Sequence, residues 1–580
     1  MTHTQICSAL AALAIVATAP AQTLAQQAYF KASNTGGSDR FGYAVALSGD
    51  TAVVGVYLED SDGVGVNGVQ NNNNASSSGA AYVFVRSGTN WSQQAYLKAS
   101  NAEGGDRFGW SVAMAGDTIV VGATRDSSAA TGVNGNQADN SAGFSGAAYV
   151  FVRAGTNWTQ QAYLKAHNTD ANDAFGTAVA VAGDVLVVGA PVEASNATGV
   201  NGDGSNNSAP SSGATYVFVR TGTNWTQEAF LKAHNAGTND LFGTTVSVSG
   251  GTVLVGALEE DSSANTVNGD GNNNAGFNAG ATYVFVRDGT NWSQQAYLKA
   301  SNTNVRDQFN NTAVESFGGS VSLDGDTALI GAYEERSNVN GVNGSQTNAS
   351  LVQAGAAYVF VRSGTNWSQQ AYLKASNTEG GDFFGWAVAL SGDTALVTAL
   401  NEGSNAMGVN GSQTNNFANF SGAAYVFVRA GTNWTQQAYL KSSNTEANDS
   451  FGRSVAVSQG SVFVGADFED SNATGVNGLQ FNNSLSASGA AYLFTGIGSG
   501  TAPAPPRLTG PTVAANGSFQ FAFTSKPATT FNVVAATNLA QPLNSWTTLA
   551  PPTEISPGVY QVSDSQAASQ PRRFYSVRSP

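Results

Sequence analysis

The chain has 580 residues and carries 39 acidic against 24 basic side chains, a formal charge of −15. This balance disfavours nucleic acid as a partner, because its phosphates would be repelled, and favours cations or basic surfaces. The only cysteine is Cys7, so a cysteine nucleophile, a disulfide and a cysteine metal ligand are excluded from the rest of the chain.

The first 25 residues (1–25) predict a secretory signal peptide. An apolar run extends from Ile6 to Ala19, and small residues follow at the candidate cleavage positions Ala21 and Ala25. The run is too short to span a membrane, and no later stretch approaches the required length of about 18 apolar residues. We therefore expect a secreted, extracellular or cell-surface protein without a membrane span.

Seven Phe-Gly dipeptides divide the following chain into repeats. The interval between them is 67 residues in every case but one, where it is 75. A period this long, with several short strand patterns in each repeat, favours radially arranged sheets over a solenoid of helix pairs. The dipeptides begin at Phe41, Phe108, Phe175, Phe242, Phe317, Phe384 and Phe451.

Each repeat contains four extended segments, which in the first repeat are residues 42–48, 51–55, 80–86 and 91–99. They are rich in Val, Tyr, Phe and Ala and are bounded by Gly, Asn, Asp or Ser, which is typical of strands. Apolar side chains on both faces require a sheet covered on both sides, as the blade of a β-propeller is. A loop of about two dozen residues joins the second and third segments, and its length suggests function.

The two ends of the repeat region complement each other. The last repeat has three of the four segments and ends at residues 490–494, whereas residues 26–33 form a fourth segment with no repeat before them. We expect the N-terminal strand to pair into the last blade, which closes the ring and leaves no open edge. The predicted fold is therefore an all-β, seven-bladed β-propeller of four-stranded blades over residues 26–497.

The repeats resemble the FG-GAP repeats of integrin alpha-chain propellers. Phe41-Gly42 is followed 14 residues later by Gly55, and the same pattern from Phe175 continues into Gly-Ala-Pro at 189–191. The whole repeat is still more similar to FG-GAP repeat proteins of secreted bacterial origin, over residues 26–494. This resemblance implies a propeller used outside the cytoplasm for binding or adhesion.

One feature of integrin propellers does not carry over. Their aspartate-rich calcium loops lie in the first hairpin of some blades, and here that hairpin is only Ser-Gly-Asp at 48–50 or a variant of it. Beyond the propeller, residues 498–510 are rich in Pro, Gly and Ala and predict a linker. Residues 511–580 contain short strand patterns that predict a small, sandwich-like C-terminal β domain.

Two series of acidic residues recur with the blades. The first lies two positions before each Phe-Gly, where we expect the carboxylate to accept hydrogen bonds from backbone N–H groups of the turn. It consists of Asp39, Asp106, Asp173, Asp240, Glu315, Asp382 and Asp449. The second lies eighteen positions after each phenylalanine and opens the long loop. It consists of Glu59, Asp126, Glu193, Glu260, Glu335, Glu402 and Glu469.

The second series opens an acid-x-Ser-x4-Val-Asn-Gly signature. Its polar members are Glu59, Ser61 and Asn67 in the first repeat and Glu469, Ser471 and Asn477 in the last. Carboxylate, hydroxyl and amide oxygens are the ligands that Ca²⁺ uses, so a calcium site is one hypothesis. A self-bonded loop with an Asn-Gly turn needs the same residues, and with one invariant charge per loop we favour that structural role. We do not expect the protein to require a cofactor.

Both acidic series are expected at one end of the propeller, where the long loops form the predicted ligand-binding face. We predict a monomeric, non-enzymatic binding or adhesion propeller that recognises a protein or glycan at the cell surface or in the matrix. A polysaccharide-active enzyme using two of the carboxylates and a purely structural envelope protein are the alternatives. A single active site would break the symmetry of the repeats, and the one clear asymmetry is an eight-residue insertion near 305–316.

Overall fold

The computed structural model describes residues 24–303 and 315–497, and in the C-terminal region 509–513, 518–524, 532–537, 546–556, 559–567 and 574–578. Most of the predicted signal peptide, of the insertion before the fifth repeat and of the linker lies outside the described residues. Residues 22–497 form one compact unit, and residues 498–580 belong to a second. None of the described residues belongs to a helix long and apolar enough to cross a membrane.

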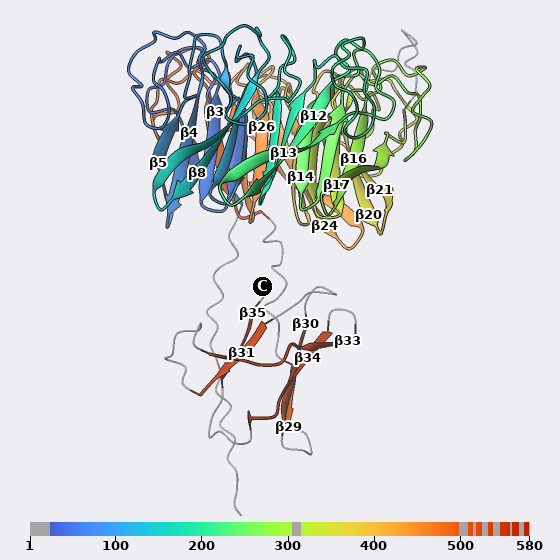
Figure 1. Cartoon of the computed structure of the whole chain (residues 1–580). Helices are drawn as coiled ribbons and strands as arrows, with labels where there is room; N and C mark the ends of the chain where they lie inside the picture. The colour runs from blue at the N-terminus through green and yellow to red at the C-terminus, as the bar shows by residue number, and fades with distance from the viewer. Residues whose placement is uncertain are drawn as a thin grey trace, which may run out of the picture. The chain divides into compact units, whose positions relative to one another are not determined.

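The first unit consists of seven antiparallel sheets of four strands each, the blades of a propeller (Figure 1). In the first blade, β2 (Ala44–Ser48), β3 (Thr51–Val56), β4 (Ala80–Ser87) and β5 (Asn90–Leu97) pair in chain order. The predicted fold class is confirmed.

The other blades repeat this order. The second has β6 (Phe108–Ala115), β7 (Thr118–Ala123), β8 (Ala147–Ala154) and β9 (Asn157–Leu164). The third has β10 (Ala178–Ala182), β11 (Val185–Ala190), β12 (Ala214–Thr221) and β13 (Asn224–Leu231). The fourth has β14 (Phe242–Ser249), β15 (Thr252–Ala257), β16 (Ala281–Asp288) and β17 (Asn291–Leu298). The fifth has β18 (Phe317–Asp324), β19 (Thr327–Ala332), β20 (Ala356–Ser363) and β21 (Asn366–Leu373). The sixth has β22 (Phe384–Ser391), β23 (Thr394–Ala399), β24 (Ala423–Ala430) and β25 (Asn433–Leu440).

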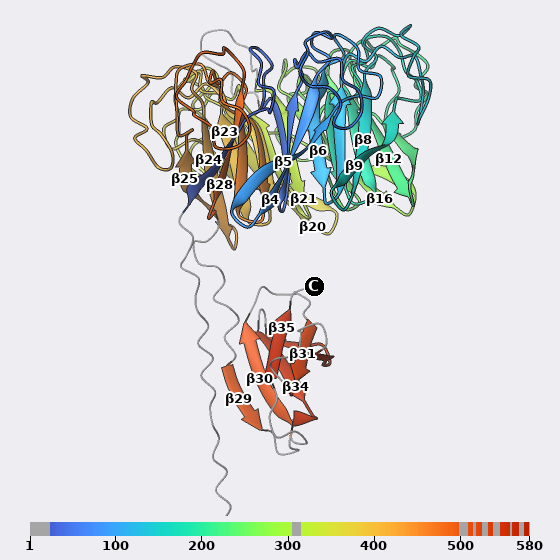
Figure 2. The ribbon, with the colours of Figure 1, turned by 90° about the vertical axis from the view of Figure 1, so that its left-hand side faces the viewer.

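The seventh blade joins the two ends of the propeller. Its strands pair in the order β1 (Ala25–Phe30), β28 (Ala490–Thr495), β27 (Ser461–Ala466) and β26 (Phe451–Ser458), so the N-terminal strand supplies its outer edge. Figure 2 shows this blue strand beside the orange β28. Phe30 is fully buried, and its ring lies 5.1 Å from that of Phe84 and 5.2 Å from that of Phe463. The predicted closure is confirmed.

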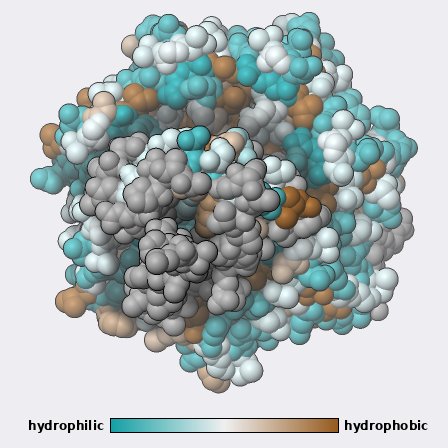
Figure 3. All heavy atoms as spheres, turned by 90° about the horizontal axis from the view of Figure 1, so that it is seen from below, coloured by the Kyte–Doolittle hydropathy of each residue, from teal (hydrophilic) through white to brown (hydrophobic). Residues whose placement is uncertain are grey.

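The first strand of every blade lies innermost. Each of these strands contacts the next around the ring, and β26 contacts β2, so the ring is complete. Together they line a central cavity of about 280 Å³. The long connections between second and third strands emerge at one end, uppermost in Figure 1. The opposite end carries the short hairpin turns, and its rim is mostly hydrophilic when seen from below (Figure 3).

The repeated glycines mark places where neighbouring blades touch through their backbones. Gly42 has a φ of +91°, and a Cβ atom there would lie 2.2 Å from the carbonyl oxygen of Ala490 in the preceding blade. A Cβ atom on Gly55 would lie 2.2 Å from the carbonyl oxygen of Gly109 in the following blade. At Gly42 and Gly55 a side chain would collide with the backbone of the neighbouring blade, whereas the sixth repeat has Thr398 at the position of Gly55, next to Gly452 of the following blade. Blade packing therefore accounts for the first glycine in all seven repeats and for the second in six of them.

The C-terminal region forms two small sheets. One has the order β29 (Thr509–Val513), β30 (Phe519–Thr524), β34 (Val559–Asp564) and β33 (Thr553–Ser556). The other has the order β32 (Thr547–Thr548), β31 (Asn532–Ala536) and β35 (Phe574–Arg578). Phe521, Val533, Tyr560 and Val562 form its small buried core.

Deleting residues 24–33 should destabilise the propeller by several kcal/mol, because the seventh blade loses the burial and ladder bonds of a whole strand. We expect the truncated protein to melt well below the full-length chain in calorimetry. A synthetic peptide of residues 24–33 should restore part of the difference, whereas a scrambled peptide should not. Equal melting temperatures for the truncated and full-length proteins would contradict this assignment of the strand.

Candidate functional site

The second acidic series lies inside the blades, not on their surface. Each of its seven residues is 1% exposed, and each forms an ion pair with a lysine that is itself no more than 1% exposed. The carboxylate–ammonium distances lie between 2.7 and 3.3 Å. The pairs are Glu59–Lys98, Asp126–Lys165, Glu193–Lys232, Glu260–Lys299, Glu335–Lys374, Glu402–Lys441 and Glu469–Lys31.

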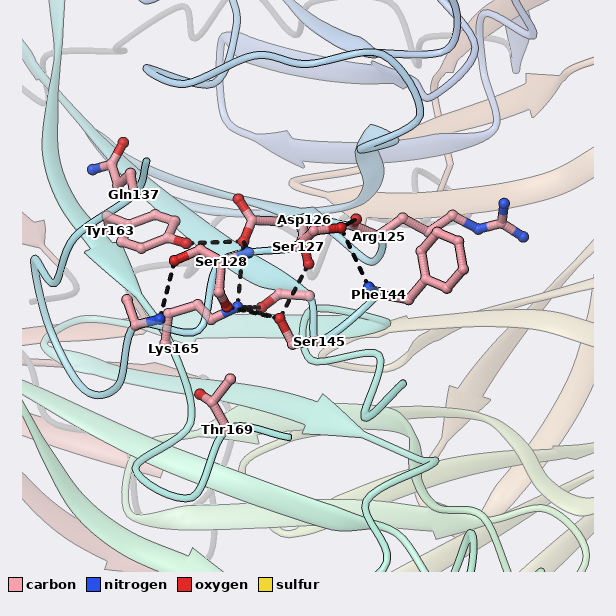
Figure 4. Close-up of polar contacts among 12 residues, drawn as sticks. Arg125, Asp126, Ser127, Ser128, Gln137, Phe144, Ser145, Tyr163, Lys165 and Thr169 are labelled. Atoms are coloured by element: carbon pink, nitrogen blue, oxygen red, sulfur yellow. Dashed lines mark hydrogen bonds and ion pairs between the residues drawn. The ribbon is translucent and has the colours of Figure 1, made fainter. Parts of the chain in front are cut away.

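Local structure explains how the two charges meet. The acidic residue begins the long loop, and the lysine directly follows the outermost strand, as Lys165 follows β9 in the second blade. Figure 4 shows this cluster: the Lys165 Nζ donates to Asp126 Oδ1 at 3.3 Å and to Ser145 Oγ at 2.7 Å. It also donates to the backbone oxygen of Gly146 at 2.6 Å, and the Tyr163 hydroxyl donates to Asp126 at 2.9 Å. All three N–H bonds of the ammonium are therefore used.

The same carboxylate ties its blade to the one before it. Asn101, which follows the outer strand of the first blade, donates to Asp126 Oδ2 at 3.0 Å. The Tyr149 hydroxyl, in the second blade, donates to the Asn101 side-chain oxygen at 2.6 Å. Equivalent asparagines contact the acidic residue of the next blade in all seven positions. The series is thus a joint between loop, outer strand and neighbouring blade.

The polar residues of the loop signature also form hydrogen bonds within the blade. The Ser61 N–H donates to Glu59 Oε2 at 3.2 Å, and its hydroxyl lies 2.6 Å from that of Tyr96. Asn67 has a φ of 55°, and its side-chain oxygen accepts from the backbone N–H of Tyr96 at 2.9 Å. In the last repeat, Ser471 lies 2.5 Å from the Tyr29 hydroxyl and Asn477 accepts from the Tyr29 backbone at 3.0 Å.

These residues do not fit a calcium ion. The lysine ammonium already lies among the oxygens that would coordinate one, because Lys98 Nζ donates to Glu59 at 3.0 Å, Ser61 O at 2.8 Å and Ser78 Oγ at 2.6 Å. A divalent cation there would meet a buried positive charge. Within the described ranges, no group of three or more His, Cys, Asp or Glu side chains is placed to hold a metal ion. The second acidic series therefore has a structural role. The prediction that these residues form a ligand-binding surface is wrong, because their side chains are buried.

The first acidic series is also buried, and it makes the predicted turn contacts. Asp173 accepts from the backbone N–H of Asp170 at 2.9 Å, and the described turns of five other repeats show the same bond. Burial raises the pKa of Asp173 to about 7, and the carboxylate of Glu193 adds to the effect. The two acidic series therefore lie close together, as expected, but neither forms an acidic surface.

Sequence reasoning missed the residues in which the repeats differ. We define the loop face as the end of the propeller formed by residues 57–79, 124–146, 191–213, 258–280, 333–355, 400–422 and 467–489. Next to it, the position two after each phenylalanine lines the mouth of the central cavity, and it holds Tyr43, Trp110, Thr177, Thr244, Gly319, Trp386 and Arg453. The signal in the sequence was the variation at a position whose neighbours are nearly invariant.

Several of these variable side chains stack on one another. The rings of Tyr43 and Trp110 are 4.9 Å apart, and the Arg453 guanidinium lies 4.3 Å from the centre of the Tyr43 ring. Arg453 also lies 5.2 Å from the Trp386 ring. Such a mixture of aromatic and cationic groups can hold planar or anionic ligands.

The two histidines beyond the predicted signal peptide make the contacts of the serines they replace. His167 Nδ1 lies 2.9 Å from Gln227 Nε2, as Ser100 Oγ lies 3.0 Å from Gln160 Nε2 one blade earlier. Burial lowers the pKa of His167. Each histidine therefore replaces a serine as a polar partner of the equivalent glutamine, and the contacts indicate no catalytic role.

Replacing one member of a buried pair should be costly, because it leaves the other charge without a partner. We expect Glu193→Gln or Lys232→Met to lower the free energy of unfolding by about 3–5 kcal/mol, and the double variant to lose less than the sum of the two. Urea unfolding measures this. The control is Asp184→Asn, which removes a carboxylate that is 65% exposed from its pair with Arg220 and should cost less than about 1 kcal/mol. Equal losses in the core and surface variants would contradict the structural role.

The raised pKa of the first series predicts a pH effect. From about pH 4, the ordinary pKa of aspartate, to pH 7, the folded protein keeps a proton on Asp173 that the unfolded chain has released, so stability falls as the pH rises through this range. Asp173→Asn keeps an acceptor but cannot ionise. We expect it to melt close to the wild type at about pH 3, where Asp173 is protonated in both the folded and the unfolded chain, and at a higher temperature than the wild type at pH 8. A melting-temperature difference that does not change with pH would contradict the raised pKa.

Comparison with known families agrees with this architecture. The FG-GAP repeat family matches residues 24–84, 91–151, 158–218, 225–285, 292–360, 367–427 and 434–494. Each match begins at the outer strand of one blade and ends in the third strand of the next, which agrees with the closure of the ring through the N-terminal strand. A comparison with curated proteins finds none that matches the chain. The matched segments cover more than half of the sequence, and the chain belongs to the FG-GAP repeat family.

Proposed function

We propose that this propeller is a secreted or cell-surface binding protein, without enzymatic activity, that recognises a protein or glycan through its loop face. FG-GAP propellers are commonly binding domains. The proposal rests on the distribution of exposed apolar side chains, and it assigns recognition to residues that vary between repeats, not to the buried acidic series.

The observation that carries the proposal is that every exposed large hydrophobic residue of the described propeller belongs to the loop face. Phe417 and Leu479 are both 83% exposed, and Phe481 is 74% exposed. The others are Val64, Val69, Phe144, Phe277, Val352, Met407, Phe420 and Phe468. Exposed apolar groups concentrated on one surface mark interaction sites, and loops on a rigid scaffold commonly carry them.

The burial of the acidic series supports binding over catalysis. A glycosidase needs two carboxyl groups that reach the sugar from opposite sides of the scissile bond. The Glu59-type residues are 1% exposed and held by lysine, so they do not offer this arrangement. The seven clusters are equivalent, whereas a single active site requires one that differs.

An array of soluble polysaccharides and matrix proteins tests the proposal. The wild type should bind at least one probe, and the combined variant Phe417→Ser, Phe420→Ser and Phe481→Ser should bind it at least tenfold more weakly, because it loses apolar contact area. The control, Thr365→Ala with Thr432→Ala, changes exposed hairpin turns at the opposite end and should bind as the wild type does. Equal loss in both variants, with folding verified by circular dichroism, would contradict a loop-face site.

A further inference from the structure

A pocket of about 250 Å³ lies beside the long loop of the second blade, between the second and third blades. Its size is just below the usual range for small-molecule sites, so it suits a single sugar ring or a group of similar size. It is lined by Arg107, Trp110, Thr124, Arg125, Phe144, Asn172, Ala174 and Thr177.

Two arginines of this pocket differ from the arginines of the third strands. The third-strand arginines pair with carboxylates, as in Arg86–Asp50, Arg153–Asp117, Arg220–Asp184, Arg287–Glu228, Arg362–Asp326 and Arg429–Asp393. Arg107 and Arg125 have no carboxylate within ion-pair distance in the part of the chain that the structure describes. The pocket therefore brings together two guanidinium groups that have no anionic partner among the described residues.

Aromatic rings hold both arginines in place. The guanidinium carbon of Arg107 lies 5.5 Å from the Trp110 ring and 5.6 Å from the Tyr57 ring. That of Arg125 lies 5.0 Å from the ring of Phe144, which is 48% exposed. Figure 4 shows Arg125 and Phe144 extending together, away from the Asp126–Lys165 cluster. Burial, and then the charge of Arg125, lower the pKa of Arg107.

The repeat provides an internal comparison for this pocket. At the positions of Arg107, Trp110, Arg125 and Phe144, the third repeat carries Ala174, Thr177, Val192 and Ser211. The backbone is the same in both, since Arg107 and Ala174 have φ values of 61° and 56°, and Phe144 and Ser211 have φ values of 58° and 54°. The fold therefore does not require the cationic and aromatic residues of the second repeat.

We propose that this pocket binds a uronate residue of an acidic polysaccharide, with Arg107 and Arg125 on the carboxylate and Trp110 and Phe144 against the sugar ring. The planar guanidinium fork matches a carboxylate, and the negative face of an aromatic ring attracts the polarised C–H groups of a sugar. The side chains of Asn172 and Thr177 can bond ring hydroxyls. This inference rests on the proposed binding function and names its ligand class.

The net charge selects among anions. A densely charged chain, such as a nucleic acid or a highly sulfated glycan, would be repelled by an acidic protein over most of its length. A polysaccharide with no more than one carboxylate on each sugar has a lower charge density, and it can place a single carboxylate on the two arginines. The pocket shares Trp110 and Thr177 with the central cavity, so neighbouring sugars have an adjacent surface on which to continue.

Isothermal titration of the full chain with oligogalacturonate tests the inference. We expect Arg107→Ala or Arg125→Val to weaken binding roughly ten- to hundredfold, the effect of losing a charged hydrogen-bonded pair. Trp110→Thr and Phe144→Ser should also weaken it. All four variants install the third-repeat residue, so they should fold. Binding should weaken as NaCl is added, because salt screens the charges.

A matched control separates the effect of losing the pocket arginines from the effect of lowering the net charge. Thr156→Glu with Thr223→Glu lowers the charge by two, as Arg107→Ala with Arg125→Val does, but at exposed hairpin turns. It should keep the wild-type affinity. The inference is overturned if oligogalacturonate does not bind, if both double variants bind equally, or if heparin, DNA or a neutral dextran binds more tightly through the same arginines. If the loop face binds another probe and Arg107→Ala does not weaken that binding, the uronate ligand is rejected. The proposed binding function would still stand.

Discussion

The buried lysine–carboxylate pair is the interaction on which the rest of this propeller depends. A charge without a partner in the interior is expensive, so the lysine after each outer strand must meet the acidic residue that opens the long loop. The asparagine from the preceding blade completes the joint, and each blade is tied to its neighbour. The last pair joins Lys31 to Glu469, 438 residues apart in the chain, so the same contact that builds a blade also closes the ring.

This arrangement separates the tasks of the repeated and the variable positions. Phe-Gly, the acidic residues, the lysine and the Val-Asn-Gly turn recur in every blade because they make contacts that every blade needs. The side chains at the mouth of the cavity and on the loop face vary because the backbone does not require them, as Arg107 and Ala174 show at φ values of 61° and 56°. A symmetric scaffold can thus carry one asymmetric site.

The fold could be predicted from the sequence because its determinants are periodic. The 67-residue interval, the strand punctuation and the lone strand at 26–33 were enough to place the blades and their closure. The role of Glu59 could not be settled, since its partner Lys98 lies 39 residues away and lysine is rarely buried. The pocket at Arg107 and Arg125 was missed for a related reason, because two blades contribute to it and it becomes visible only where the repeats disagree.

Hydrogen exchange with and without oligogalacturonate tests the central claim most directly, namely that one asymmetric site lies on a symmetric scaffold. The account predicts that the ligand slows exchange in residues 105–110 and 124–146 of the second blade and near Asn172 of the third. The six remaining long loops, with the same buried ion pairs, should exchange at unchanged rates. Equal protection of all seven loops would contradict the account, because it would place recognition in the repeated residues.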